Sequence, residues 1–573
     1  MRIVVIGSFG SSGDQHYRVH QPAAALAALP GVEVFEVHPD ARYRDAAALA
    51  ADLLVLTMTL DLEAFRLIRQ RRLLGRPTVV EVNDYLPDVQ AWNPAAGSWR
   101  DPRGQKLFHG LIHNADACQF SSSGLAERLQ QQARSAVVFP NHLDAIPGFD
   151  ALKHRADGRP LRIGWGGSIG HLEDLRHIAP ALLQWLPQQS DVQLEIMADP
   201  SLAAVFEGKA EENVLIRTPG SLDHYRSWLN SLHIGLAPLL PTDYNRCRSD
   251  VKFLEYAAAG AAAVLQNETP YQALAATDLA SLFDSPEAMI QQLEGLVQNP
   301  EQRLEQARRA HAYVSTNRDI QTAVVERQTF YVGLLQQSNS VPGPLPAPLE
   351  QQRERTLTQI PGWKRIGERH WRLNLSSSNA DQGFAKGLKA LQGGHWSAAT
   401  DHLQAAIQNA PDHAPAHTFL GVCAEKQGQS EQASRAFRTA HQLDPLALRP
   451  RRGLERPHQR TFAAARLLER RGNSAAAERH YRAILDQLPS HNGALLQLAT
   501  LLQRQGNSEQ AAFCLERLLH AHPDHVHGHT NHSILLSRQG QWPEAQAACQ
   551  RALAIDPSFL PAQRQQHHLA RHS

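Results

Sequence analysis

The C-terminal third of the chain contains a five-fold repeat, which constrains the fold more than any other feature of the sequence. Prolines recur with spacings of 34, 44, 34 and 34 residues, at Pro411, Pro445, Pro489, Pro523 and Pro557. A glycine stands seventeen residues before each proline, and an alanine follows each glycine after five residues. Glycine ends the first helix of each repeat, and the small alanine lets the second helix approach closely. Proline marks the end of the second helix, where the chain leaves the repeat. The region is therefore predicted to be a stack of helical hairpins, with one ten-residue insert around Leu446 to Glu455.

This pattern resembles the tetratricopeptide repeat, with five copies in residues 380–573. The resemblance implies an all-α superhelix whose concave groove binds an extended peptide or a protein partner. Five arginines lie in or beside the insert: Arg449, Arg451, Arg452, Arg456 and Arg460. They indicate either a contact with an acidic partner or a solvated loop.

Residues 1–337 alternate strand-like and helical segments in two successive series, which open at Met1–Gly7 and at Leu161–Trp165. This alternation predicts an α/β fold with two doubly wound, Rossmann-like parallel sheets and a crevice at the carboxyl ends of the strands. We therefore expect domains at 1–150 and 151–337, then a proline-rich linker and bridge at 338–379, then the repeats. The linker prediction rests on the sequence SNSVPGPLPAPLE at 338–350, which disfavours helix and strand. Trp363 and Trp371 are candidates for packing in the bridge.

In the second series, a strand leads into the sequence GGSIGH at 166–171, and a helix follows. Glycines let backbone N–H groups approach an anion closely, and the N-terminus of the following helix favours negative charge. The turn is therefore a candidate site for a diphosphate. Glycines at such a turn also serve close packing alone, and this alternative stays open.

A second segment, NRCRSDVKFLEYAAAG at 245–260, predicts a helix capped by Ser249 or Asp250. Lys252 and Glu255 then lie three residues apart on one side of that helix. The two form either a surface ion pair or a functional pair. In a functional pair, the lysine binds a phosphate and the carboxylate binds ribose hydroxyls.

Together the two segments resemble the donor-binding half of group-1 glycosyltransferases, which have the GT-B fold. The N-terminal half fits more loosely, through the loop Gly7–Gly13 with Tyr17 and Arg18, and through EVNDYLPD (81–88), NADACQFSSSGLAERL (114–129) and VFPNHLD (138–144). The resemblance covers about residues 1–335 and implies transfer of a hexosyl group from a nucleotide sugar to an acceptor. In this family the nucleotide sugar lies against the C-terminal domain and the acceptor against the N-terminal one.

Carried over residue by residue, the resemblance implies donor binding by Gly167, Ser168, His171, Arg248, Lys252 and Glu255. Glu255 matches the family carboxylate that holds the ribose, and Arg248 and Lys252 are the nearest cations for the diphosphate. The family's paired glutamates stand eight positions apart, but here the position eight before Glu255 is Cys247. Ser168 and His171 likewise stand where the family has an arginine and a lysine. The stereochemical outcome therefore stays open.

The catalytic residues depend on that outcome. An inverting reaction needs a base near the acceptor hydroxyl. The candidates are Asp84, His109 and Asp14, and each of them could equally have a structural role. In the family's proposed retaining route, the leaving phosphate takes the acceptor proton, and fixed cations and helix dipoles stabilise the diphosphate without a metal.

We expect no metal and no cofactor besides the nucleotide sugar, which acts as a co-substrate. Six histidines cluster in one segment of the repeats: His520, His522, His525, His527, His529 and His532. A metal site is the less favoured interpretation, because these side chains should scatter around two helices and a turn.

Composition narrows the possible partners and location. The 573 residues contain 57 Lys+Arg and 56 Asp+Glu, a balance that argues against a dedicated nucleic-acid binder. The longest apolar or Gly/Ala run, Tyr256 to Leu265, is far shorter than the roughly 18 residues of a membrane span. Five cysteines without a CxxC pair favour the reducing cytoplasm.

The sequence leaves two main interpretations and a weaker third. The first is a cytoplasmic glycosyltransferase whose repeats recruit a glycan or protein acceptor, or a protein partner. The second is a non-catalytic scaffold in which a degenerate transferase core supports the repeats. The third is a sugar-nucleotide epimerase with the GT-B fold. Glu255, Lys252 and the glycine turn favour the first interpretation, and Cys247 favours the second.

Overall fold

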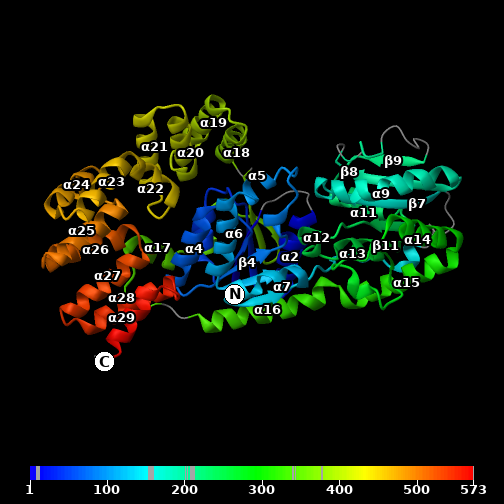
Figure 1. Cartoon of the computed structure of the whole chain (residues 1–573), viewed down its shortest axis with the longest axis horizontal. Coiled ribbons are helices and arrows are strands. Elements are labelled where there is room, and N and C mark those ends of the chain that lie inside the picture. The colour runs from blue at the N-terminus through cyan, green and yellow to red at the C-terminus, as the bar shows by residue number, and fades with distance from the viewer. Residues whose placement is uncertain are drawn as a thin grey trace. The chain divides into compact units, whose positions relative to one another are not determined.

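The computed structural model describes residues 1–7, 13–152, 160–199, 202, 204–206, 213–338, 341, 344–375 and 378–571 (Figure 1). The chain divides into two compact units. Unit 1 comprises Met1–Ser8, Gly31–Thr78 and Val332–Ser573, and unit 2 comprises Phe9–Pro30 and Val79–Tyr331. The predicted domain 1–150 is thus distributed over both units. Most of the predicted loop Gly7–Gly13, and part of the predicted linker, lie outside the described residues.

Unit 1 contributes strands in the order β13-β14-β2-β1-β3. Their bounds are β1 Arg2–Ile6, β2 Glu33–Val37, β3 Leu53–Thr57, β13 Lys364–Gly367 and β14 His370–Leu373. The three N-terminal strands are parallel, and Ile3 pairs with Val34 on one side and with Leu53 on the other. Buried runs of Val, Ile and Leu are typical of such strands, because both faces of a parallel sheet are covered. Helices α3 (Arg44–Ala50) and α4 (Leu62–Leu73) accompany them.

The segment predicted as a linker and bridge is largely structured. Strand β14 adds to the sheet beside β2, and the ring of Trp371 stacks on Phe35 with centroids 4.7 Å apart. Trp363 meets the same Phe35 ring edge-on at 5.0 Å. Helix α17 (Ala347–Glu354) begins inside the predicted linker, and η8 (Leu357–Gln359) follows it. The expectation that 338–350 lacks regular structure is therefore wrong for its last residues, because proline is well tolerated at the start of a helix.

The repeat region folds into consecutive helical hairpins (Figure 1). The paired helices are α18 (Asn379–Gln392) and α19 (Trp396–Asn409), α20 (Ala414–Lys426) and α21 (Ser430–Leu443), α23 (Gln459–Arg470) and α24 (Ser474–Gln487), α25 (Asn492–Arg504) and α26 (Ser508–Ala521), and α27 (Val526–Arg538) and α28 (Trp542–Ile555); α29 (Leu560–Leu569) ends the stack. Each repeat glycine ends a first helix with φ between 74° and 82°, as a left-handed cap requires. Each repeat alanine is buried. The predicted all-α region is confirmed.

The ten-residue insert forms helix α22 (Leu448–Glu455), followed by η9 (Arg456–His458), so the solvated-loop interpretation is wrong. Its N-terminus is capped from the α/β part of unit 1, because Glu63 accepts hydrogen bonds from the backbone N–H groups of Leu448 and Arg449 at 2.8 Å. Arg449 also lies 3.6 Å from Asp61. The acidic partner of the basic insert is thus within the chain, and the insert docks the repeats on α4.

Unit 2 contains two groups of parallel strands. The first is β4 (Thr78–Val82), whose first residue closes unit 1, with β5 (Ala117–Phe120) and β6 (Ala136–Val138). The second is a six-stranded sheet in the order β12-β11-β10-β7-β8-β9. Its strands are β7 Leu161–Gly167, β8 Val192–Ala198, β9 Val214–Arg217, β10 Ile234–Ala237, β11 Ala262–Gln266 and β12 Ser281–Phe283. The predicted α/β class with parallel sheets is confirmed.

Helices connect these strands in chain order. They are α1 Gly13–Gln15, η1 His16–His20, α2 Gln21–Ala28, η2 Leu86–Asp88, α5 Ala96–Trp99, α6 Pro102–Asn114, α7 Ser123–Leu129, η3 Gln130–Gln132, α8 Phe149–Leu152, η5 Ile169–His171, α9 Leu172–Trp185, η6 Leu186–Gln188, α11 Leu222–Leu229, α12 Asp243–Arg246, α13 Val251–Ala258, η7 Gln272–Leu274, α14 Pro286–Gln298, α15 Pro300–Asn317 and α16 Ile320–Gln337.

In the described residues, no helix combines the length and the apolar character needed to cross a membrane.

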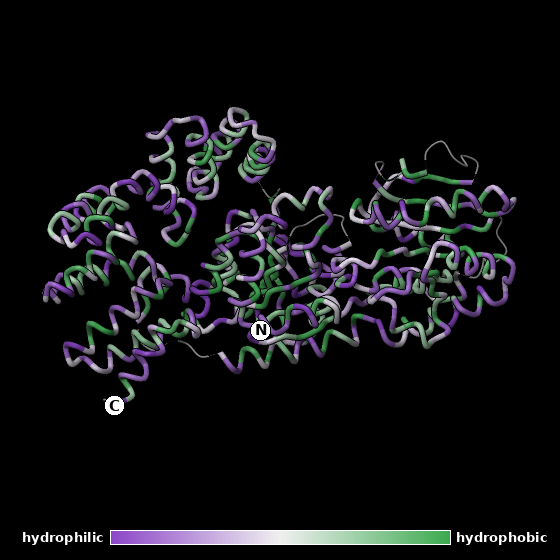
Figure 2. Tube along the Cα trace, viewed as in Figure 1, coloured by the Kyte–Doolittle hydropathy of each residue, from purple (hydrophilic) through white to green (hydrophobic). Residues whose placement is uncertain are grey.

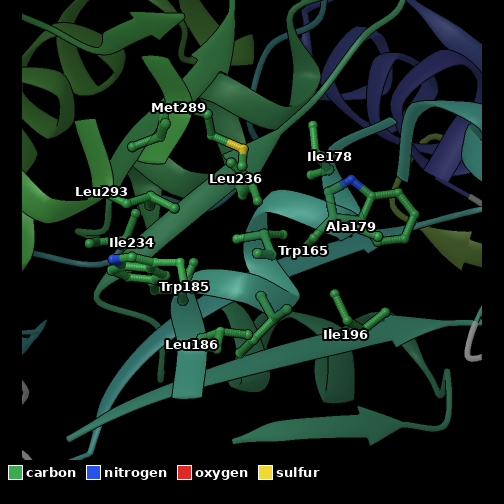
Figure 3. Close-up of a cluster of buried hydrophobic side chains, with 14 of the residues drawn as sticks. Trp165, Ile178, Ala179, Trp185, Leu186, Ile196, Ile234, Leu236, Met289 and Leu293 are labelled. Carbon is green, nitrogen blue, oxygen red and sulfur yellow. The ribbon is translucent and has the colours of Figure 1, made fainter. Parts of the chain in front are cut away.

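The core of the six-stranded sheet is aliphatic and aromatic. Trp165 of β7 and Leu236 of β10 are buried with Ile178 and Trp185 of α9 and with Leu293 of α14 (Figure 3). Figure 2 shows hydrophobic residues concentrated in the strands of this sheet. Burial on this scale fixes β7 and α9, and therefore the turn between them.

Candidate functional site

The last two residues of β7, Gly166 and Gly167, serve packing. A Cβ on Gly166 would lie 2.8 Å from the ring of Tyr225, and a Cβ on Gly167 would lie 2.6 Å from the ring of Trp165. A side chain at either position would collide with an aromatic ring. Gly170 differs, because polar groups surround its side-chain position.

Three hydrogen-bond donors converge on that position. A Cβ on Gly170 would lie 3.0 Å from Nη2 of Arg248, 3.5 Å from Oγ of Ser168 and 3.7 Å from Nδ2 of Asn93. Oδ1 of Asn93 already accepts a hydrogen bond from the backbone N–H of Ala95 at 2.9 Å. A guanidinium, a hydroxyl and an amide N–H₂ on one side of Gly170 can donate hydrogen bonds to an anion that lies beside them. We call this group the Gly170 cradle.

Neutral groups accept the hydrogen bonds of Arg248, while the nearby carboxylates of Asp84, Asp174 and Asp14 stabilise its charge. Its Nη1 donates to Nε2 of His171 at 2.7 Å, and its Nη2 donates to the hydroxyl of Tyr244 at 3.0 Å. The guanidinium also lies over the Tyr244 ring, 4.7 Å from the centroid. Its Nε is buried and has no hydrogen-bond partner in the described part of the chain. Nε of Arg248 is therefore a hydrogen-bond donor that a ligand could still use.

His171 positions Arg248 by accepting its Nη1 hydrogen bond. Nδ1 of His171 is 2.8 Å from Oδ2 of Asp174, whose Oδ1 accepts from the backbone N–H of Leu240 and from Nδ2 of Asn245. Burial first, and then the charge of Arg248, lower the pKa of His171 to about 4. His171 is therefore neutral, so that Nδ1–H donates to Asp174 and the Nε2 lone pair accepts from Arg248.

The structure shows Lys252 and Glu255 of α13 in contact, as their spacing predicts. Nζ of Lys252 donates to Oε2 of Glu255 at 2.9 Å and to the hydroxyl of Tyr225 at 2.7 Å. Tyr225 donates to the same Oε2 at 2.9 Å, and Tyr17 of η1 donates to Oε1 at 3.0 Å. Burial, followed by the charge of Glu255, raises the pKa of both tyrosines well above the usual value. Glu255 is thus a buried carboxylate with three donors, one of which lies 238 residues away in the sequence.

A buried ion pair fixes η1, the helix that carries Tyr17. Arg18 lies 2.7 Å from Glu81 of β4, and both side chains are almost inaccessible to solvent. Arg18 also donates to the backbone carbonyl of Phe139 and to Oδ1 of Asn141, each at 2.8 Å. Nδ2 of Asn141 donates to Ser249 at 2.9 Å, just before α13. This network joins the segments on which Tyr17 and Glu255 lie.

Two of the three predicted bases interact with each other. Burial, and next the repulsion by Asp14, raise the pKa of Asp84 to about 7, while the charge of Arg248 opposes the rise. His109 lies on α6, where its Nδ1 is 2.8 Å from Oε1 of Gln132. The structure therefore groups Asp84 and Asp14 with Arg248 and gives His109 a different partner.

Cys247, eight positions before Glu255, is buried against α7. Its backbone carbonyl accepts from Ser122 at 2.7 Å, and its thiol lies 3.8 Å from the carbonyl of Gly124. Burial raises the pKa of this thiol to about 11. At neutral pH it is a neutral thiol and supplies no carboxylate for a sugar.

The six clustered histidines do not converge. His522 lies 2.8 Å from the carbonyl of Ser490, and His529 lies 2.8 Å from the carbonyl of Pro523. His525 caps α27 by accepting from Gly528 N–H. Within the described ranges of the chain, no group of three or more His, Cys, Asp or Glu side chains could hold a metal ion.

Sequence reasoning missed Asn93 of the Gly170 cradle and also Tyr225. Asn93 lies between η2 and α5, and Gln90 in the same segment donates to the carbonyl of Gly170 at 3.2 Å. Tyr225 lies on α11, beside Gly166. No motif marks either residue, because each reaches the site from another segment of the chain.

Comparison with known families finds matches in two parts of the chain. Residues 176–325 match a family described as glycosyl transferase-like. Residues 384–447 and 468–530 match two tetratricopeptide repeat families. These matches confirm both predicted resemblances. No curated protein matches the chain.

Several solved structures are similar to the chain. Sucrose-phosphate synthase of Thermosynechococcus elongatus has a TM-score of 0.44 and 14% identity, over 59% of this chain and 100% of that one. HepE of Anabaena, in complex with UDP-glucose, has a TM-score of 0.45 and 13% identity, over 58% of this chain and 100% of that one. A glycosyltransferase of Rickettsia africae has a TM-score of 0.42 and 10% identity, over 59% of this chain and 99% of that one.

Proposed function

We propose that unit 2 binds a nucleoside diphosphate sugar and that the chain transfers its hexosyl group to a glycan or protein acceptor. The observation that carries the proposal is the Gly170 cradle, where Arg248, Ser168 and Asn93 converge beside the start of α9. The diphosphate is the natural anion for this arrangement, since the N-terminus of α9 also favours negative charge. Glu255 then accepts hydrogen bonds from the ribose, with Lys252 beside it.

The test is the release of nucleoside diphosphate from a panel of UDP-, GDP- and ADP-sugars. We expect slow release from sugars of one nucleotide, because water replaces the acceptor when no acceptor is present. Chromatography with mass spectrometry separates hydrolysis from epimerisation. Hydrolysis gives free sugar and nucleoside diphosphate, whereas epimerisation gives a nucleotide sugar of the same mass with a different retention time. Failure to consume any donor, at a concentration that saturates binding, would contradict the proposal.

Tyr17 competes with the ribose for Glu255. The carboxylate of Glu255 has about four lone-pair positions, and three donors already use three of them. A ribose diol donates two hydrogen bonds, so it needs the position that the Tyr17 hydroxyl holds. Tyr17→Phe should therefore tighten donor binding about 3- to 10-fold, as measured by calorimetry. This factor corresponds to the net free energy of roughly one hydrogen bond. Tyr313→Phe, on α15, is the matched control and should leave the affinity unchanged. Weaker donor binding by Tyr17→Phe would show that Tyr17 supports the donor instead.

The pKa of Asp84 gives a pH test for an inverting reaction. As the acceptor-side base, Asp84 is active when ionised, so kcat/KM for transfer should fall as the pH decreases through about 7. Asp14→Asn removes a repulsion that raises this pKa, and the fall should move to lower pH. Glu173→Gln, on the exposed side of α9, serves as the control. An unchanged pH profile in Asp14→Asn would remove Asp84 from the reaction.

Two specific observations favour the scaffold alternative. Cys247 supplies no carboxylate, and Glu255 already receives three hydrogen bonds. In that case unit 2 would neither bind nor consume a nucleotide sugar, and the donor panel decides between the two functions.

We also propose that the repeats select the acceptor or a protein partner. The repeats form hairpin helices of the kind that bind extended chains, and α22 holds them on α4. Deleting the repeats would expose Glu63 and its buried neighbours in α4, so point substitutions are the better test of this role.

A further inference from the structure

Strand β9 forms one edge of the six-stranded sheet of unit 2, where the strand order ends β7-β8-β9. It pairs with β8 in parallel, and among the described residues no strand lies on its other side. Leu215 and Ile216, in the middle of β9, have exposed fractions of 36% and 38%. Adjacent residues of a strand point to opposite faces of the sheet. Both faces are therefore apolar and accessible at this edge.

The pairing of β9 with β8 identifies the backbone groups on its outer side. The backbone N–H of Leu194 donates to the carbonyl of Asn213 at 2.8 Å, and Leu194 is the ladder partner of Val214. In a parallel ladder of this register, alternate residues of β9 direct their N–H and C=O groups toward β8, and the residues between them direct theirs away. The backbone groups of Val214 and Ile216 therefore point outward. Such an open row is a template for another strand.

No charged side chain of β9 shields this edge, although charged residues often protect edge strands. The strand has one charged residue, Arg217, whose Nε donates to Oε2 of Glu195 on β8 at 2.5 Å. Glu195 is fully buried, so it holds the guanidinium over the neighbouring strand. The side chain of Asn213, just before β9, donates to the carbonyls of Leu186 and Gln189. The outer side of β9 thus offers backbone groups and apolar side chains.

The sequence of β9 is complementary to a second copy of itself. Two antiparallel copies related by a two-fold axis perpendicular to the sheet place one residue opposite its own copy. With the axis at Leu215, Leu215 faces the partner subunit's Leu215, and Val214 exchanges both backbone hydrogen bonds with the partner subunit's Ile216. Apolar cross-strand pairs then form on both faces of the sheet. With the axis at Ile216, Leu215 would instead face the partner subunit's Arg217.

We propose that β9 pairs with β9 of a second copy of this chain, antiparallel and centred on Leu215. The six-stranded sheets of the two subunits then become continuous across the two-fold axis. Strand pairing alone forms a small interface compared with the roughly 1,200–2,000 Å² of stable complexes, so the dimer dissociates on dilution. The proposal does not depend on the transfer reaction.

Sedimentation velocity of the full chain, over a wide range of protein concentration, measures the dissociation constant of the dimer. Ile216→Lys places a charge in the interface, and Ile216→Pro removes an outward N–H without removing a bond to β8. Each variant should raise the dissociation constant about tenfold or more, because the two-fold axis repeats the change in both strands. Leu467→Lys, at an exposed leucine of α23, is the matched control. Thermal melting shows that each variant is folded.

A cysteine at the axis tests the register. The Cα atoms of a non-hydrogen-bonded antiparallel pair lie about 4.5 Å apart, within the range for a disulfide. Leu215→Cys should therefore form a disulfide with its own copy on mild oxidation. Ile216→Cys, its control, faces the partner subunit's Val214 and should not form one. The five native cysteines are all buried.

We expect the mass of the wild-type protein to rise from that of a monomer toward that of a dimer with concentration, and a disulfide to form in Leu215→Cys alone. A monomer at every concentration would overturn the proposal. A dimer that both Ile216 variants leave unchanged, or that Leu467→Lys weakens equally, would overturn it as well. Disulfide formation in Ile216→Cys as fast as in Leu215→Cys would contradict the pairing centred on Leu215.

Discussion

Replacing Arg18 by methionine is expected to destabilise unit 2 by about 3–5 kcal/mol, because it leaves the carboxylate of Glu81 buried without its cation. Methionine keeps most of the apolar volume of the side chain, so the loss reports the unpaired charge. Native-state hydrogen exchange of the β5 amides, beside Glu81, measures this free energy. A single denaturation curve would not, because a chain with two compact units need not unfold in one step.

Two further variants separate this effect from the loss of an ordinary ion pair. Arg2→Met breaks the exposed pair with Glu33, which is 3.2 Å long, and should have an effect below about 1 kcal/mol. The double variant Arg18→Met/Glu81→Leu removes both buried charges and should recover most of the lost stability. A loss for Arg18→Met no larger than that for Arg2→Met would contradict this account of η1.

Arg248→Gln is expected to weaken binding of the nucleotide-sugar donor about 10- to 100-fold. This range corresponds to the loss of a hydrogen bond to a charged group, about 1.5–3 kcal/mol. The KM for donor hydrolysis should rise accordingly. Some thermal stability should also be lost, because Asp84, Asp174 and Asp14 lose a nearby cation, so the KM is measured below the melting temperature of the variant. Arg248→Lys keeps the charge but loses the planar fork, and should fall between the wild type and Arg248→Gln.

Arg246→Gln is the matched control for this prediction. Arg246 stands two residues earlier, and about half of its side chain is exposed beside Asp243 and Glu268. Its replacement should leave the KM for the donor unchanged. Equal effects of Arg246→Gln and Arg248→Gln would mean that the Gly170 cradle does not bind the diphosphate.

The repeat region was predictable because its signal is local. Each glycine that ends a first helix needs a left-handed φ, and the observed φ values lie between 74° and 82°. The parallel strands were predictable for a similar reason, because a short run of apolar residues indicates a strand that is buried on both faces. The addition of β14 beside β2 was not predictable, because the two strands lie more than 300 residues apart in the sequence.

The site was only partly predictable from the sequence. Lys252 and Glu255 lie three residues apart on one helix, so their contact follows from helical geometry. Tyr17 reaches Glu255, and Asn93 reaches Gly170, through tertiary packing alone. The insert was predicted from its spacing, but its acidic partner Glu63 could be identified only in the folded chain.

The most direct test of the central claim is a calorimetric titration of the wild-type chain with UDP, GDP and ADP, each compared with its nucleoside. The Gly170 cradle predicts that one diphosphate binds with a stoichiometry of one. It also predicts that the matching nucleoside binds at least about 100-fold more weakly, since the nucleoside lacks the anion that Arg248, Ser168 and Asn93 surround. Equal affinity for nucleoside and diphosphate, or no binding of any diphosphate, would contradict the assignment of the Gly170 cradle to a nucleotide-sugar donor.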